Sequence, residues 1–112
     1  SFGLAARRRP GFPGVWVGDD KIASVGIHVR NWVTRHGVAL NVAVQAEHFS
    51  MIRPCGLPVR AVSMNERLAA PAAWDDVERR LASETADLLG RRLVERSLRE
   101  VGEGPWAAYP RT

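Results

Sequence analysis

The stretch Lys21-Ile22-Ala23-Ser24-Val25-Gly26-Ile27-His28-Val29-Arg30 (KIASVGIHVR) carries the clearest structural signal in this chain of 112 residues. Apolar and more polar residues alternate along it, a pattern that is typical of a β-strand with one buried face. We therefore expect a half-buried strand, and its polar face is free to line a site. The two faces hold Val25, Ile27 and Val29 on one side and Ser24, Gly26, His28 and Arg30 on the other.

Shorter signals flank this strand on both sides. Before it, Val15-Trp16-Val17 predicts another strand, and Gly18-Asp19-Asp20 predicts a tight turn. After it, Arg35-His36-Gly37 predicts a short turn, and alternation from Val38 to Val44 predicts a strand antiparallel to its neighbour. Residues 1–13 are rich in Arg, Gly and Pro, so we expect a surface loop there.

From Ser63 the apolar residues recur at helical spacing. The segment Ser63 to Glu66 matches a capping box, which predicts a short helix to about Ala70. Apolar residues from Trp74 onward predict a long amphipathic helix, which Gly90 either ends or interrupts. Residues 102–112 are expected to form a loose tail.

Strands followed by helices indicate an α/β chain of the α+β kind, with a mixed, largely antiparallel sheet and helices packed on it. At 112 residues and 46% hydrophobic content, the chain can bury one modest core, so we expect a single domain over residues 1–112. It has no run of about 18 apolar residues, and its first residues lack the pattern of a signal peptide. These features predict a soluble protein of the cytoplasm.

The basic balance of the chain indicates an acidic partner. The 16 basic residues, 15 of them Arg, exceed the 12 acidic ones and give a net charge of +4. Nucleic acid, an acidic protein and a membrane surface all fit such a charge, and a merely solvated charged face is the plainer alternative. The aromatic residues are scattered and do not interleave with the arginines, so the pattern of a nucleic-acid site is weak.

The only lysine, Lys21, and the only cysteine, Cys55, are the main candidates for chemistry. Of the two basic residue types, only lysine readily loses its proton near neutral pH. A thiol with an ordinary pKa of about 8.5 needs a cation or a base beside it to react, and Lys21 is able to supply one. The local sequence IRPCGLP (52–58) fits equally a nucleophile and a small residue buried in a turn. A lone cysteine excludes an internal disulfide and a thiolate-rich zinc site.

Two small-residue segments, Ser24-Val25-Gly26 and Gly37-Val38-Ala39, fall on the neighbouring strands. Small side chains leave room for a ligand chain across a sheet, although packing against another part of the protein is the alternative. His36 is either a base for the cysteine or a turn residue. His28 and His48 have no carboxylates at ligand spacing, so we expect no metal site.

Four segments taken together resemble the lipoyl(octanoyl) transferase family. The resemblance runs in order from about Pro13 to Gly56 and continues more weakly to the helix that begins at Trp74. The segments are Gly14-Val15-Trp16-Val17, the KIASVGIHVR stretch, Val33-Thr34-Arg35-His36-Gly37-Val38-Ala39-Leu40-Asn41-Val42 and Pro54-Cys55-Gly56.

This resemblance implies a catalytic domain of the biotin/lipoate protein ligase fold, without a cofactor or a metal. The implied reaction moves an octanoyl group from octanoyl-acyl carrier protein to a lysine of a lipoyl domain. Lipoyl domains of 2-oxoacid dehydrogenases and the H protein of glycine cleavage are the implied acceptors, with no nucleic acid and no membrane involved. In this scheme Cys55 carries the acyl group as a thioester, and Lys21 lowers the pKa of the thiol and shuttles protons. The implied acyl-binding residues are Ser24, Val25, Gly26, Gly37, Val38 and Ala39.

The sequence departs from the family in two ways. Family members are longer, and their N-terminal half carries an Arg-Gly-Gly and a His-Gly-Pro-Gly-Gln segment that this chain lacks, so it resembles the C-terminal half alone. Gln45-Ala46 replaces an Asp-Leu pair that is common in the family. Two alternatives stay open: an ATP-dependent lipoate or biotin protein ligase of the same fold, and a noncatalytic basic half-domain that binds acidic proteins.

Overall fold

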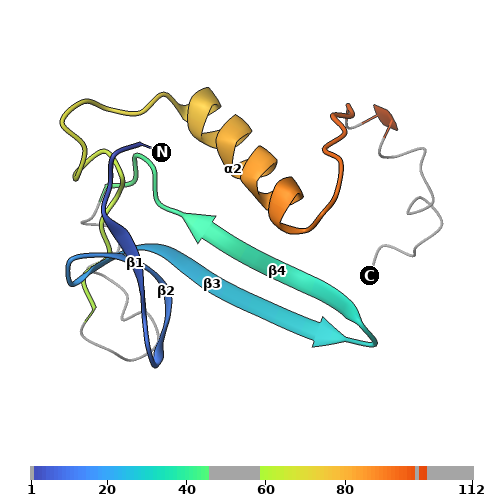
Figure 1. The fold of residues 1–112 in the computed structure, drawn as a ribbon, viewed down its shortest axis with the longest axis horizontal. Coiled ribbons are helices and arrows are strands. Elements are labelled where there is room, and N and C mark those ends of the chain that lie inside the picture. The colour runs from blue at the N-terminus through green and yellow to red at the C-terminus, as the bar shows by residue number, and fades with distance from the viewer. Residues whose placement is uncertain (1, 46–58, 98, 101–112) are drawn as a thin grey trace. The chain divides into compact units, whose positions relative to one another are not determined.

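The computed structural model describes residues 2–45, 59–97 and 99–100, and it has the α+β architecture that the sequence predicts (Figure 1). Two compact units, Ser1–Val77 and Glu78–Thr112, divide the chain, and each is described by itself. The elements are β1 (Ala6–Arg9), β2 (Phe12–Val17), β3 (Asp20–Arg30), β4 (Val33–Leu40) and α2 (Trp74–Leu88).

The four strands form one sheet in the order β1-β2-β3-β4, and every neighbouring pair is antiparallel (Figure 1). One parallel contact is added where Lys21 in β3 forms a β-bridge with Ala61. The predicted mixed, largely antiparallel sheet is therefore confirmed.

The expectation of a loop over residues 1–13 is wrong, because β1 and β2 form a hairpin there. Arg9 pairs with Phe12, which leaves Pro10 and Gly11 as a two-residue turn. A proline followed by a glycine with a φ of 78° fits a type II turn, in which the second central residue needs a positive φ. The proline and glycine at positions 10 and 11 therefore mark the turn between two strands and not an extended loop.

The turn between β3 and β4 lies earlier than the sequence predicted. Asn31 and Trp32 have φ values of 51° and 63°, as a two-residue type I′ turn requires. The expected turn at Arg35-His36-Gly37 is therefore wrong, since these residues lie inside β4. The strand expected from Val38 to Val44 ends at Leu40.

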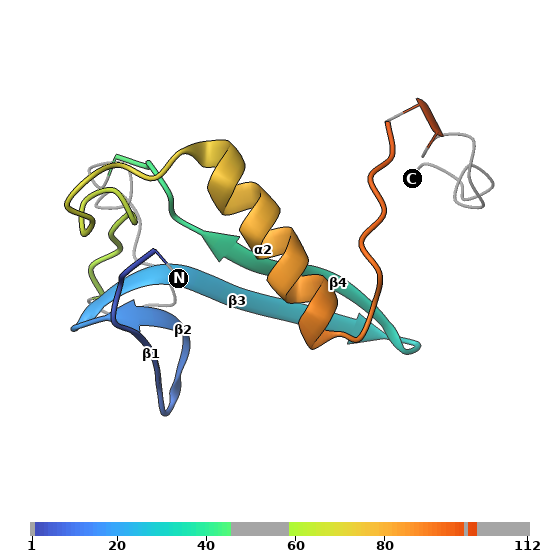
Figure 2. The same ribbon diagram turned by 45° about the horizontal axis from the view of Figure 1, so that its top comes forward.

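Strand β3 is buried at its start, at Ile22 and Ala23, and the rest of the strand extends beyond the hydrophobic core. Strand β2 pairs only with residues of β3 up to Ala23, and from Ser24 onward β3 continues with β4 alone as a two-stranded ribbon (Figure 2). Every residue of β3 from Ser24 to Arg30 is exposed, so the expected burial of Val25, Ile27 and Val29 is wrong. The buried apolar residues are Trp16, Ile22, Ala23, Val42, Val62, Met64 and Val77.

The capping box at Ser63 forms, but the short helix predicted after it does not. Ser63 N–H donates to Glu66 Oε1 (3.0 Å), and Glu66 N–H donates to Ser63 Oγ (3.4 Å). A single turn follows, after which Asn65 Oδ1 accepts a hydrogen bond from Ala72 N–H (2.9 Å). Pro71 disfavours helical backbone in the residue before it, which explains why the turn is not continued.

Helix α2 ends at Leu88, two residues before Gly90. Of the two predicted possibilities, that Gly90 ends the helix or interrupts it, the first is the one observed. Gly90 N–H donates to Asp87 O (3.0 Å), and Arg91 N–H donates to Ala86 O (2.8 Å). With Gly90 at a φ of 59°, these two bonds form a Schellman motif. Residues 91–97 are not helical, so the alternative, a helix that continues past Gly90, is wrong for them.

Candidate functional site

The backbone of Lys21 is held between two segments of the first unit. On one side Lys21 pairs with Trp16 in β2. On the other side Lys21 N–H donates to Arg60 O (2.9 Å), and Val62 N–H donates to Lys21 O (3.0 Å). Lys21 therefore has a fixed position in the sheet, beside the segment that follows Cys55 in the sequence.

Asn41, just after β4, fixes that neighbouring segment to the sheet. Its amide Nδ2 donates to Val62 O (3.2 Å), and its backbone N–H donates to Ile22 O (2.9 Å). Met64 N–H donates to Asn41 O (2.7 Å). One residue therefore connects β3, the end of β4 and the chain from Val62 to Met64.

The side chain of Lys21 crosses the backbone of Gly14. A Cβ atom built on Gly14 would overlap Lys21 Cε and the carbonyl oxygen of Ala23. Gly14 has a φ of 133°, which also disfavours any other residue. The sequence signal was a glycine at the edge of a strand pattern, because glycine in a strand often marks such close approach.

Trp16 is a buried aromatic residue beside Lys21. The residue is 1% exposed, and its indole N–H donates to Phe12 O (3.2 Å). The Lys21 ammonium lies 5.9 Å from the centroid of the Trp16 ring, within the range of a cation–π contact. The Arg9 guanidinium lies 5.3 Å from the centroid of the same ring.

An open hollow of about 340 Å³ lies on the β3–β4 ribbon. Ser24 pairs with Ala39, Val25 with Val38 and Gly26 with Gly37, so the two predicted small-residue segments lie side by side. Val25 does not line the hollow, and the acyl-binding role of these residues stays a prediction. The lining residues are Ser24, Gly26, His36, Gly37, Val38 and Ala39.

His36 is the lining residue whose place the sequence did not predict. It pairs with Ile27 inside β4 and has a φ of 68°. The sequence signal was the pair His36-Gly37, which was interpreted as a turn between strands. Both residues do have positive φ, but they lie inside β4.

Cys55 and His48 lie outside the described residues, so their predicted roles stay predictions. Among the residues that the structure does describe, no three His, Cys, Asp or Glu residues are grouped closely enough to hold a metal ion. No described helix is long and apolar enough to cross a membrane.

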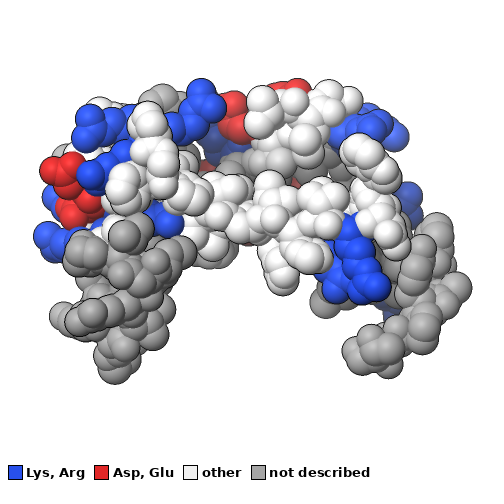
Figure 3. Space-filling model, turned by 90° about the horizontal axis from the view of Figure 1, so that it is seen from below, with Lys and Arg blue, Asp and Glu red and all other residues white. Residues whose placement is uncertain are grey.

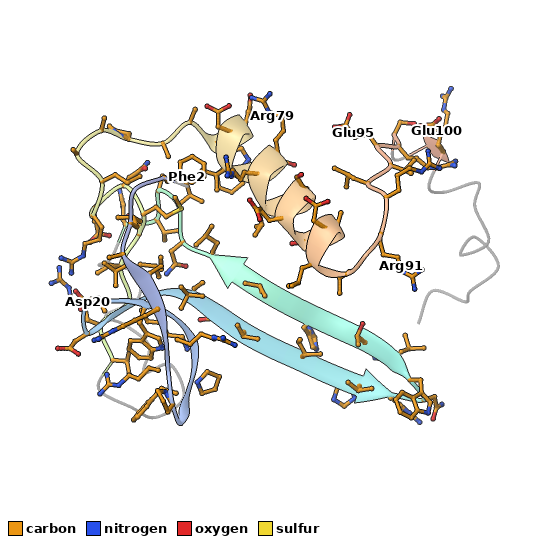
Figure 4. All side chains as sticks on the ribbon, viewed as in Figure 1. Phe2, Asp20, Arg79, Arg91, Glu95 and Glu100 are labelled. Carbon is orange, nitrogen blue, oxygen red and sulfur yellow. The ribbon has the colours of Figure 1, made fainter. Side chains whose placement is uncertain are left out.

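The surface charges form local groups. On the face drawn in Figure 3, acidic side chains lie among the basic ones. Arg7 and Arg9 approach Asp19 at 3.9 and 4.0 Å, and Arg67 pairs with Asp20. Asp20 lies at the start of β3 (Figure 4). Part of the basic excess near β1 is therefore neutralised locally, as a solvated charged face would be.

Residues 1–86 match the model of the lipoyl protein ligase A/B catalytic domain. The chain belongs to this family. It is 44% identical over 93 residues to an octanoyltransferase of Geobacter metallireducens, which covers 82% of the chain and 44% of that relative. It is 43% identical over 101 residues to an octanoyltransferase of Syntrophobacter fumaroxidans, which covers 89% of the chain and 44% of that relative.

A third octanoyltransferase, from Desulfovibrio desulfuricans, is 55% identical over 71 residues, or 62% of the chain and 30% of that relative. The resemblance to this family that the sequence motifs indicated is confirmed. The chain spans less than half the length of the curated relatives it matches.

Proposed function

We propose that this chain carries the nucleophile and the proton-transfer residue of an octanoyltransferase, Cys55 and Lys21. The proposed reaction moves an octanoyl group from octanoyl-acyl carrier protein to a lysine of a lipoyl domain. The names of the relatives support the acyl group and the type of transfer. The observation that carries the proposal is the β-bridge between Lys21 and Ala61.

This bridge bears on Cys55 through the connectivity of the chain. Cys55 precedes Arg60 by five positions, and five residues of chain span at most about 18 Å. The Arg60 carbonyl accepts a hydrogen bond from Lys21 N–H, so the sheet brings the segment after the cysteine directly to the lysine. Two residues that are far apart in sequence thereby become candidates for one site.

In the first half of the reaction, the Cys55 thiolate attacks the thioester carbonyl of the carrier protein. The bond between that carbonyl carbon and the carrier's sulfur breaks, and the new bond joins the octanoyl group to Cys55. The Lys21 ammonium gives its proton to the departing carrier thiolate. The products are the free carrier thiol, the Cys55 thioester and a neutral Lys21.

In the second half, the neutral amine of the acceptor lysine attacks the Cys55 thioester. Lys21 takes a proton from the attacking nitrogen, and the Cys55 thiolate leaves as the amide bond forms. The thiolate and ammonium of the starting enzyme are restored. An arginine at position 21 would stabilise the thiolate, but it would not accept the proton.

The Lys21 side chain is held in place by its neighbours in β2. Its ammonium lies 5.9 Å from the centroid of the Trp16 ring, and the side chain is half-buried against Gly14. No carboxylate pairs with the Lys21 ammonium among the ion pairs of the described residues.

Intact-mass spectrometry after incubation with octanoyl-carrier protein tests the proposal. The folded protein should gain one octanoyl group, which hydroxylamine removes, and Cys55→Ala should gain none. Lys21→Arg should still form the adduct, because the carrier thiolate can take its proton from solvent, but it should transfer the octanoyl group slowly to a lipoyl-domain lysine. A folded protein that gains no octanoyl group would contradict the proposal.

The family also includes ligases, as its description states, so an ATP-dependent lipoate protein ligase is the second candidate. Such an enzyme activates the acyl group as an adenylate and needs no cysteine. If the protein is a ligase, Cys55→Ser should leave ligation with lipoate and ATP intact. If it is a transferase, Cys55→Ser should abolish transfer from the carrier protein. The two outcomes separate the candidates.

A further inference from the structure

The hollow on the β3–β4 ribbon has a direction, which the strand register defines. The Ser24–Ala39 pair lies nearest to Lys21, and the Gly26–Gly37 pair follows. The outermost residue that lines the hollow is His36, which pairs with Ile27. The hollow therefore runs along the ribbon away from Lys21 and ends at His36.

Apart from Val38 and His36, the residues that line the hollow have small side chains. Cβ atoms built on Gly26 and Gly37 meet no other atom within 4 Å, so substituents there would project into open space. Ser24 and Ala39 are also small. His36 has the largest side chain among the lining residues, and the next pair outward, His28 and Arg35, does not line the hollow.

The backbone of His36 is unusual for a residue in a strand. Its φ of 68° lies in the left-handed region, which is sparsely populated by residues other than glycine. Regular alternation would place His36 and Val38 on the opposite face from Gly37 and Ala39, yet all four residues line the same hollow. Strained backbone of this kind is often found at ligand-binding sites.

The length of the hollow matches a medium acyl chain. Three strand residues separate the Ser24 level from the Ile27 level, a rise of about 10 Å. An extended octanoyl chain has about this length. A longer chain would reach past His36 to the exposed pair of His28 and Arg35, where polar groups offer its last carbons little apolar contact.

We propose that His36 closes the far end of an acyl-binding groove and thereby sets the preferred length of the acyl chain. This inference rests on the proposed octanoyltransferase function, and it assigns His36 a role in substrate specificity. In this role His36 contacts the end of the acyl chain and no reacting atom. Each methylene group of the acyl chain that finds no apolar contact lowers the binding constant roughly fourfold. A side chain that excludes one or two methylene groups is therefore enough to select among acyl-chain lengths.

The test compares acyl-adduct formation by wild-type protein, His36→Gly and His28→Gly with hexanoyl-, octanoyl-, decanoyl- and dodecanoyl-carrier protein. Glycine tolerates the positive φ at position 36, and the same change at position 28 is the matched control one pair further out. In His36→Gly, we expect the ratio of decanoyl to octanoyl adduct to rise roughly tenfold. The ratio should stay at the wild-type value in His28→Gly.

The outcomes separate this inference from the function on which it rests. If wild type and His36→Gly form adducts with the same chain-length profile, the role of His36 is overturned and the transferase function stands. If the wild type forms no adduct with any donor, the function and the inference both fall. Should His36→Gly not fold, His36→Asn replaces it, because asparagine is smaller and tolerates positive φ.

Discussion

Lys21 and Ala61 form a parallel β-bridge, in which the backbone of Lys21 accepts a hydrogen bond from Val62 and donates one to Arg60. The four strands of the sheet pair antiparallel. The bridge is the parallel contact that joins a later part of the chain to the start of β3. The lysine of the proposed dyad is thus fixed by the same segment that leads back to the cysteine. The predictions below test what holds this arrangement together and what it does.

Replacing Gly14 by alanine should disturb Lys21. The added Cβ would overlap Lys21 Cε and the Ala23 carbonyl oxygen, and strain at positive φ costs about 1–3 kcal/mol of stability. We expect a lower urea midpoint and a large loss of octanoyl-adduct formation. Gly18→Ala is the matched control, because Gly18 also has positive φ but a Cβ there meets nothing within 4 Å. Equal loss of adduct formation in the two variants would show that the contact with Lys21 is irrelevant.

Replacing Asn41 by alanine should loosen the segment beside Lys21. The change removes the hydrogen bond from Asn41 Nδ2 to Val62 O, at a cost of about 1 kcal/mol. We expect adduct formation to fall more than this stability loss explains. Asn65→Ala removes a comparable bond to Ala72 N–H and serves as the control. Urea unfolding and octanoyl-adduct formation are measured on both variants and compared. Unchanged adduct formation in Asn41→Ala would count against a role of Asn41 in positioning the segment beside Lys21.

Replacing Gly26 by valine should fill the hollow without harming the fold. A Cβ at this position projects into open space, and valine suits a strand better than glycine does. The thermal midpoint should therefore hold or rise slightly, while the octanoyl adduct falls and shorter acyl chains are favoured. Ile27→Val, in the neighbouring strand position that does not line the hollow, is the control. An undiminished octanoyl adduct in Gly26→Val would show that the acyl chain lies elsewhere.

The Ser97–Glu100 capping box predicts a local dependence on pH. The backbone N–H of Ser97 donates to Glu100 Oε2 (2.6 Å), and this bond, with a smaller contribution from the Ser97 side chain, lowers the pKa of Glu100. Because the folded pKa is depressed, the stabilisation is present above the ordinary value of 4.5 and is lost as the pH falls through the lowered value. NMR titration of the Glu100 carboxyl should show this lowered pKa, and Ser97→Ala should raise it. An ordinary pKa in the wild type would mean that the cap is not populated.

Local patterns in the sequence predicted much of this structure. The alternation of KIASVGIHVR defined β3, and Ser63-x-x-Glu66 correctly located a capping box. The pair His36-Gly37 was predicted to lie in a turn, but it lies inside β4, where both residues have positive φ. The exposure of Ile27, at 60%, depends on where β2 stops pairing with β3, which no local pattern shows.

The arrangement around Lys21 shows why the site was only partly predictable. The lone lysine and the lone cysteine were visible as residues, and the family motifs connected them. The contacts that position Lys21, with Gly14 in β2 and with the segment from Arg60 to Val62, join parts of the chain that are distant in sequence. Such pairings depend on tertiary structure, so neither the spacing nor the composition of the chain indicated them.

The central claim is that Lys21 acts on the Cys55 thiol, and the pH dependence of cysteine alkylation tests it most directly. The rate of alkylation by iodoacetamide reports the thiolate fraction, and Cys55 is the only thiol in the chain. In the wild type, the account predicts that the alkylation rate reaches half of its maximum at a pH below the ordinary cysteine pKa of about 8.5. In folded Lys21→Met, this midpoint should lie at a clearly higher pH. Identical midpoints in the two proteins would contradict it.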